Sequence, residues 1–235
     1  MNALWYALVA AGANVLGAAA VTSRRAWSTR TLELLIALAA GFMLSVALAD
    51  LIPDAIIRDQ QRGAVFVLAG FLLVHLTQHA LVGHFHFGEE THAVSKHVSI
   101  SALAGLLLHT FGDGVAIASG FLVSPQLGVL VFGAIFLHKL PEGLAISSLV
   151  IASGGSRAAA LGAAALLGVA TIAGVLLTNS FGPLAHYGLA LSGGVTLYVG
   201  ASNLIPEFQH KSGWNHNFAF FGGVASYFLA RSVIA

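Results

Sequence analysis

Apolar residues occur in eight long runs along the chain, separated by short segments rich in turn residues such as Ser124-Pro125 and Gly182-Pro183. Each run holds about 20 residues with few charges, the length that an α-helix needs to cross the hydrocarbon core of a bilayer. We therefore predict an all-α membrane protein with eight transmembrane helices. They are expected near residues 2–22, 31–53, 63–83, 98–122, 127–151, 156–178, 183–206 and 215–234.

The composition supports this class and limits the possible partners and metal ligands. Of the 235 residues, 57% are hydrophobic and 8% are charged, whereas roughly a quarter of the residues in an ordinary soluble domain are charged. The formal net charge of +1 gives no clustered positive field, so we expect no nucleic-acid partner. Cysteine is absent, which excludes disulfides and thiolate metal sites and leaves His, Asp, Glu and Met as side-chain ligands.

The polar connections predict how the chain sits in the membrane. Lys and Arg are more frequent in the loops after the odd-numbered runs, so the positive-inside rule places both termini outside and residues 84–97 in the cytoplasm. Residues 84–97 read HFHFGEETHAVSKH and form a His-rich loop that is too polar to span. We expect residues 1–235 to form a single polytopic domain in the cell (inner) membrane, with its first run retained as a helix.

Two short segments of similar sequence indicate an internal repeat. DLIPD at residues 50–54 ends the second run, and NLIPE at residues 203–207 ends the seventh. The second and seventh helices cross the membrane in opposite directions, so matching segments would be related by inversion, as in many transporters. Two unrelated helix ends that stop at proline would give the same pattern.

The fourth and fifth runs share the pattern H-x-x-x-[DE]-G, as HTFGDG from His109 and HKLPEG from His138. Each imidazole is four residues before a carboxylate, Asp113 or Glu142, so both side chains of a pair lie on one helix face. Consecutive spanning helices are antiparallel, and the two pairs can therefore face each other at similar depth. We predict that these four residues share one ion, although any single one could serve only as a hydrogen bond between helices.

The ligand types indicate which ion is bound. Ionisable groups near the bilayer centre each cost about 2.5–3.5 kcal/mol, a cost that a divalent cation would offset. Two imidazoles and two carboxylates suit Zn²⁺ better than Mg²⁺ or Ca²⁺, with Fe²⁺, Mn²⁺, Co²⁺ and Cd²⁺ left open. Protonated Lys139 cannot be a ligand, and we predict that it is a counter-ion to Asp113 and Glu142 in the place of a second metal. Pairing of Lys139 at another interface is the alternative.

The two motifs resemble those of the ZIP family of zinc and iron transporters, whose fourth and fifth helices carry HNxxDG and HExPEG. The resemblance extends over essentially the whole chain, including the eight helices, the outward termini, the His-rich loop and the LIPE-like end of helix 7. It implies that His109, Asp113, His138 and Glu142 are the primary ligands and that Zn²⁺ moves toward the cytoplasm.

The chain departs from the family pattern at two positions. Thr110 stands where the family often has Asn, and Lys139 stands where it often has Glu, Asp or Asn. A second metal site of the family type therefore looks disabled, and we expect a mononuclear site.

Several other residues are candidates for the ion pathway, each with a structural alternative. Met43 is a candidate outer ligand or a core residue, and Asp50 is a pathway ligand or a helix end in the headgroups. His75 and His79 share a helix face and form either part of the exit or a hydrogen-bonded structural pair. Exit candidates near the end of the seventh run are Glu207 and His210. Candidates for weak metal capture in the loop, or else a solvated run without function, are His84, His86, His92 and His97.

The leading prediction is a carrier that moves the ion by alternating access. Its partners would be divalent metal ions and the lipid bilayer, with no resident cofactor, and a homodimer is left open. One alternative is an intramembrane zinc-dependent hydrolase, against which the absence of an H-E-x-x-H signature counts. Another is a proton-coupled antiporter that uses Asp113, Glu142 and Lys139 without a metal substrate.

Overall fold

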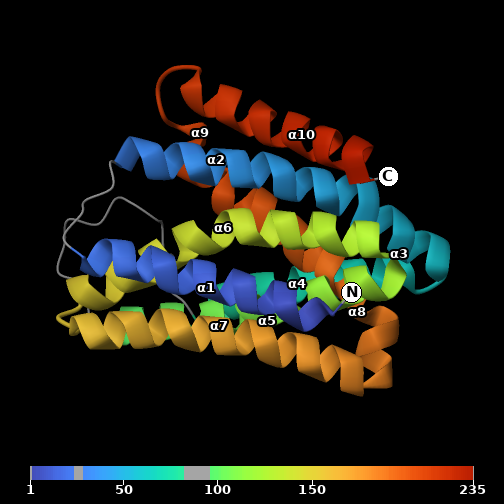
Figure 1. Ribbon diagram of the computed structural model, residues 1–235, viewed down its shortest axis with the longest axis horizontal. Coiled ribbons are helices and arrows are strands. Elements are labelled where there is room, and N and C mark those ends of the chain that lie inside the picture. The colour runs from blue at the N-terminus through green and yellow to red at the C-terminus, as the bar shows by residue number, and fades with distance from the viewer. Residues whose placement is uncertain (1, 24–28, 82–95, 235) are drawn as a thin grey trace.

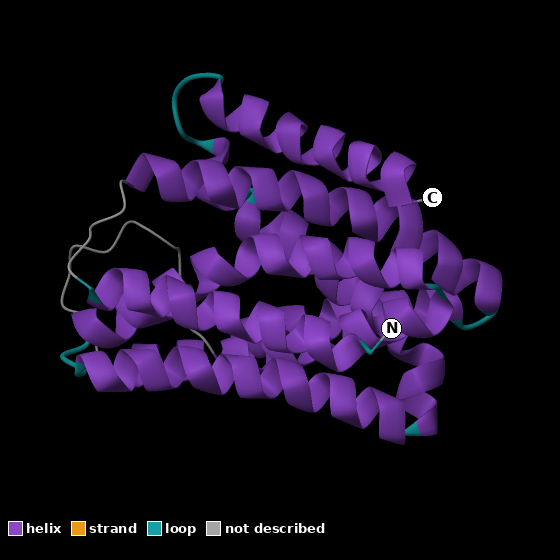
Figure 2. Ribbon diagram, in the orientation of Figure 1, coloured by secondary structure: helices purple, strands orange, loops and turns teal. Residues whose placement is uncertain are grey.

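The computed structural model describes residues 2–23, 29–81 and 96–234, and this part of the chain contains helices and no strand (Figures 1 and 2). The long helices lie side by side along the longest axis of the molecule (Figure 1). The α-helices are α1 Ala3–Thr22, α2 Thr29–Val46, α3 Ile52–Arg58, α4 Gly63–Leu81, α5 Lys96–Val123, α6 Pro125–Ala152, α7 Arg157–Ser180, α8 Gly182–Tyr198, α9 Pro206–Gln209 and α10 Asn215–Ile234, and the π-helical segments are η1 Ala47–Leu51 and η2 Val199–Leu204.

The eight predicted spans correspond to these helices, so the predicted fold class is confirmed. The second span consists of α2, η1 and α3, and the seventh consists of α8, η2 and α9. Within the described residues, six helical segments are long and apolar enough to cross a membrane, and α4 contributes a shorter apolar stretch over Gly63–Thr77. α10, which carries Arg231, is as long as α1 but is not one of those six.

The structure corrects one detail of the predicted repeat, because neither proline-containing motif ends its helix. The helix continues past Pro53 to Arg58 and past Pro206 to Gln209. Proline has no N–H to donate within a helix, and both copies accommodate it with the wider π-helical turn that precedes it. In each copy the last N–H before the proline reaches back five residues, from Ile52 to Ala47 and from Ile205 to Gly200. The shared irregularity agrees with an inverted repeat.

Helix packing follows the same symmetry. α2 packs against α10 and α4 packs against α8, and in both pairs the backbones approach closely at glycines. A methyl group added at any of these positions would overlap a backbone oxygen of the partner helix. The glycines of the two crossings are Gly41 and Gly223, and Gly70 and Gly194. Gly41 and Gly194 are separated by the same number of residues as Gly70 and Gly223. The DLIPD and NLIPE motifs have this separation as well.

The other four long helices, α1, α5, α6 and α7, pack together in an equivalent way. α1 lies against α6, and α5 lies against α7. Close backbone approach again occurs at paired glycines, Gly17 with Gly143 and Gly114 with Gly174. α5 and α6 also contact each other, so this bundle fixes the depth at which their motif residues meet.

These crossings give a stability prediction. We expect Gly41→Ala to lower the stability of the protein by about 1–3 kcal/mol, because the new methyl group would force α2 away from α10. Gly222→Ala on α10 is the matched control, since no atom lies within 4 Å of the added methyl group, and it should be neutral or slightly stabilising because alanine is the better helix former. Thermal unfolding in detergent measures both, and equal melting temperatures for the two variants would contradict this description of the crossing.

Candidate metal site

The two H-x-x-x-[DE]-G motifs meet in the interior, where α5 and α6 face each other. α5 contributes His109 and Asp113, and α6 contributes His138 and Glu142. All four side chains are buried, and one ligand atom from each lies within 4.8 Å of the others. The fold therefore brings together the four residues whose spacing indicated an ion site.

The distances between donor atoms are close to those of a tetrahedral metal site. Oδ2 of Asp113 lies 3.3 Å from Nε2 of His138 and 3.5 Å from Nε2 of His109, and Oε2 of Glu142 lies 3.9 Å from both nitrogens. Zn²⁺ bound at about 2.0–2.1 Å from each donor needs donors roughly 3.3 Å apart. The two contacts of Glu142 are therefore longer than a tetrahedral zinc site needs, and those of Asp113 are close to it.

Hydrogen bonding around His138 presents the nitrogen that a metal requires. Nδ1 of His138 lies 3.0 Å from the carbonyl oxygen of Ala134, and Nε2 lies 3.3 Å from Oδ2 of Asp113. In the tautomer that donates from Nδ1, the lone pair of Nε2 is directed at the site. Nδ1 of His109 and Oε1 of Glu142 are buried and have no hydrogen-bond partner among the described residues. Two atoms of the four-residue cluster thus lack partners within the described chain.

Lys139 lies beside the four residues and is fully buried. Its ammonium nitrogen is 2.7 Å from Oδ2 of Asp113 and 2.9 Å from Oε2 of Glu142. These are the same carboxylate oxygens that face the imidazoles. The ammonium therefore lies where a counter-ion to both carboxylates is expected.

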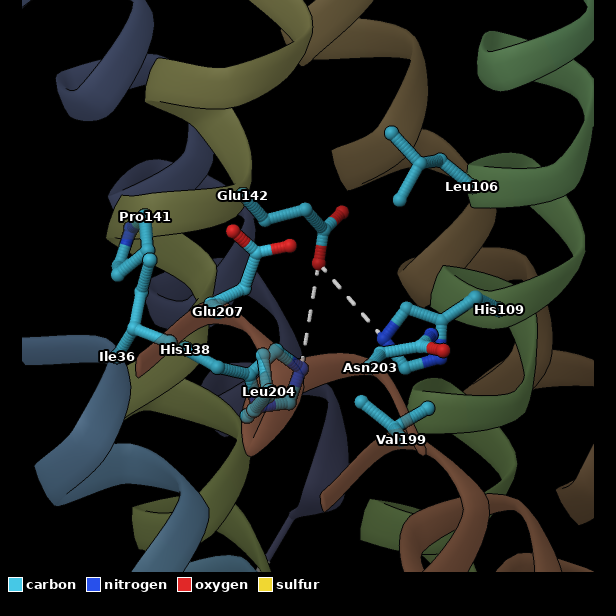
Figure 3. Close-up of a pocket in the computed structure, with 10 residues that line it drawn as sticks. All are labelled: Ile36, Leu106, His109, His138, Pro141, Glu142, Val199, Asn203, Leu204 and Glu207. Atoms are coloured by element: carbon cyan, nitrogen blue, oxygen red, sulfur yellow. Dashed lines mark ion pairs between the residues drawn. The ribbon is translucent and has the colours of Figure 1, made fainter. Parts of the chain in front are cut away.

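A cavity borders the site and extends from it toward η2 and α9 (Figure 3). Figure 3 shows the carboxylate of Glu142 between the imidazoles of His109 and His138, with Asn203 and Glu207 around the same cavity. Glu207 was predicted as an exit residue. Asn203 was not predicted to be a site residue. The signal that could have identified it is its position in the repeat, which is equivalent to that of Asp50. The other lining residues are Ile36, Leu106, Pro141, Val199 and Leu204.

Asp50 is buried in η1 rather than in the headgroups at a helix end, and its carboxylate binds residues of α10. Oδ2 accepts a hydrogen bond of 2.7 Å from the Tyr227 hydroxyl, and Oδ1 lies 3.3 Å from Nη2 of Arg231. Sequence reasoning missed both partners, because neither belongs to a motif. Met43 is fully buried in the core cluster and does not line the cavity beside the four-residue cluster.

The remaining predicted pathway residues lie away from the four-residue cluster. Nδ1 of His75 is 3.5 Å from the Tyr198 hydroxyl, and Nε2 of exposed His210 is 3.0 Å from Nε2 of Gln209. The predictions for the His79 side chain, for His84, His86 and His92, and for the His97 side chain fall outside what the structure describes.

Comparison with known proteins identifies the family. Residues 77–231 match a family model described as ZIP zinc transporter. The chain is 34% identical over 167 residues to zinc transporter GufA of Myxococcus xanthus, a match that covers 66% of the chain and 65% of that protein. It is 24% identical over 216 residues to zinc transporter YKE4 of Saccharomyces cerevisiae, covering 77% of the chain and 62% of that protein. The chain thus spans less than two thirds of the length of these relatives. By the extent of the match to the family model, the chain belongs to the ZIP family.

Proposed function

We propose that the protein carries divalent metal ions, with Zn²⁺ as the preferred substrate, across a cell membrane. The observation that carries this proposal is the cluster of His109, Asp113, His138 and Glu142, whose ligand atoms lie within 4.8 Å of one another inside membrane-spanning helices. Family membership and the zinc-transporter names of the relatives support transport over hydrolysis.

The four side chains would replace the water shell of the ion. Nε2 of each imidazole donates a lone pair, and the carboxylates of Asp113 and Glu142 offset the double positive charge that the bilayer interior disfavours. Lys139 limits the site to one ion, because its buried ammonium keeps a positive charge beside the two carboxylates, which a second cation would have to displace. The proposed site is therefore mononuclear.

The cavity supports a direction of movement. It extends from His109 and Glu142 toward Asn203 and Glu207, at the end of the bundle that the loop charges place in the cytoplasm. We propose that an ion released from the site passes Glu207 on this side, with His210, His75 and His79 farther along. Met43 and Asp50 would belong to the entry from the opposite side. The direction is then uptake, with both termini outside.

Zinc flux into liposomes tests the proposal. Liposomes that contain the purified protein should accumulate Zn²⁺ faster than protein-free liposomes, and excess Cd²⁺, Fe²⁺ or Mn²⁺ should compete in the order of their affinity for nitrogen and carboxylate ligands. Absence of protein-dependent flux would overturn the proposal. Zinc-dependent hydrolysis without flux would indicate a hydrolase, and proton-driven transport without any metal requirement would indicate an antiporter.

A further inference from the structure

Asn14 on α1 is a buried polar residue whose side chain has no partner among the described residues. Its side chain has no exposed surface, and neither the amide nitrogen nor the amide oxygen has a hydrogen-bond partner among the described residues. A buried amide without partners is unfavourable, especially in a membrane-spanning bundle. A second state of the protein in which the amide is paired would account for its presence.

The packing of α1 shows where Asn14 points. A methyl group at Gly17 would meet the backbone of α6, and one at Gly168 of α7 would meet Ala11. Gly17 and Ala11 therefore mark the α6-facing and α7-facing sides of α1, about 120° apart around the helix axis. Asn14 lies midway between them, so its side chain is directed toward the centre of the bundle.

The crossing of α1 and α6 places Lys139 one helical turn from the point where α6 meets Asn14. A methyl group at Gly143 would overlap the backbone of Asn14, and Lys139 is one turn before Gly143 on the same face of α6, about 5–6 Å away. α1 and α6 run in the same direction (Figure 1). Because side chains tilt toward the N-terminus of their helix, the amide of Asn14 tilts back toward the level of Lys139.

An ion bound to Asp113 Oδ2 and Glu142 Oε2 would compete with the Lys139 ammonium for both of its present acceptors. Nζ of Lys139 contacts Oδ2 of Asp113 and Oε2 of Glu142, which are the oxygens closest to the two imidazoles. An ion bound there takes these oxygens and repels the ammonium. A buried ammonium without an acceptor would oppose binding.

We propose that the amide oxygen of Asn14 accepts the Lys139 ammonium when the ion is bound. Asn14 is thus a positioning residue that stabilises the metal-loaded form through Lys139. The inference rests on the proposed metal site and adds a residue to it. In this structure the amide has no partner among the described residues, and in the metal-loaded form it would accept the ammonium in place of an oxygen that the ion binds.

The repeat provides a matched control. The close contact of Gly17 with Gly143 corresponds to that of Gly174 with Gly114. Thr171 of α7 lies three residues before Gly174, as Asn14 of α1 lies three residues before Gly17. Thr171 is equally buried, but its hydroxyl donates to the carbonyl oxygen of Leu167 in its own helix at 3.3 Å. It therefore has a partner already and is not available to the lysine.

A double-mutant cycle tests the inference. Zn²⁺ affinity is measured by calorimetry on the purified full chain for Asn14→Leu, Lys139→Met and the double variant, with Thr171→Val as control. We expect Asn14→Leu to weaken zinc binding about tenfold or more, as for the loss of a hydrogen bond to a charged group. In the Lys139→Met background the same substitution should change affinity less than about twofold, because no ammonium remains to be accepted.

The melting temperature without zinc provides a second readout. Asn14→Leu removes two unpaired polar atoms and should leave the metal-free protein as stable as before or more stable, whereas a structural role would make it less stable. Equal losses of affinity in both backgrounds, unchanged affinity in Asn14→Leu, or a lower metal-free melting temperature would overturn the inference alone. Failure of the unmodified protein to bind zinc would overturn the proposed function and this inference with it.

Discussion

Replacing Asp113 with asparagine is expected to reduce zinc uptake by at least about a hundredfold. Oδ2 of Asp113 lies within 3.5 Å of His109 Nε2, His138 Nε2 and Lys139 Nζ, so this atom is the centre of the cluster. The amide keeps the size of the side chain but removes one of the two charges that offset the ion. Removing one partner of a buried charge pair costs about 3–5 kcal/mol, and each 1.4 kcal/mol corresponds to about a tenfold change in affinity.

The measurement is initial zinc flux into liposomes, together with zinc affinity in detergent. Asp59→Asn is the matched control, because Asp59 follows the end of α3 and accepts hydrogen bonds from the backbone N–H groups of Gln61 and Arg62. Asparagine can keep these bonds, so uptake should be unchanged. If Asp113→Asn transports zinc within about threefold of the unmodified protein, Asp113 is not a ligand.

Replacing Lys139 with glutamate is expected to change both the metal content and the stability of the protein. The substitution exchanges a buried ammonium for a third carboxylate beside Asp113 and Glu142. Without metal, the uncompensated charges should lower stability by about 3–5 kcal/mol. With zinc, the three carboxylates and two imidazoles can hold a second ion, and we expect two bound Zn²⁺ per chain instead of one.

Elemental analysis of the purified variant gives the number of bound ions, and thermal unfolding with zinc or with a chelator gives the stability. Zinc should restore the melting temperature, since a ligand that binds only the folded state stabilises it. Arg157→Glu makes the same charge change at an exposed position and should alter neither quantity. A single zinc ion in Lys139→Glu would show that Lys139 does not exclude a second one.

The fold and the centre of the site could be predicted because both depend on local periodicity. Runs of about 20 apolar residues define spans without reference to tertiary contacts. His109 with Asp113, and His138 with Glu142, share a helix face through their spacing alone, and the antiparallel order of consecutive spans makes the two faces meet. Lys139 directly follows His138 in the same helix, so its place beside the cluster could be predicted as well.

Features that depend on contacts between distant segments could not be predicted. Asp50 of η1 pairs with Tyr227 and Arg231 of α10, which are distant in the sequence. No sequence motif indicates this pairing. Asn14 looked like one polar residue in an apolar run, and its lack of partners became visible only with the bundle assembled. The motifs at Pro53 and Pro206 predict helix ends, whereas the structure continues each helix past its proline, because a proline in sequence does not reveal whether the preceding turn can widen.

The equal spacing between the two halves of the chain has one more consequence. Val199 and Asn203 line the cavity at one end of the bundle, and their counterparts in the first half, Val46 and Asp50, are buried at the other end. A conformer in which the halves exchange their roles would expose Val46 and Asp50 and seal Val199 and Asn203. Since the natural chain has no cysteine, thiol labelling at single introduced cysteines reports on the two conformers without any background to remove.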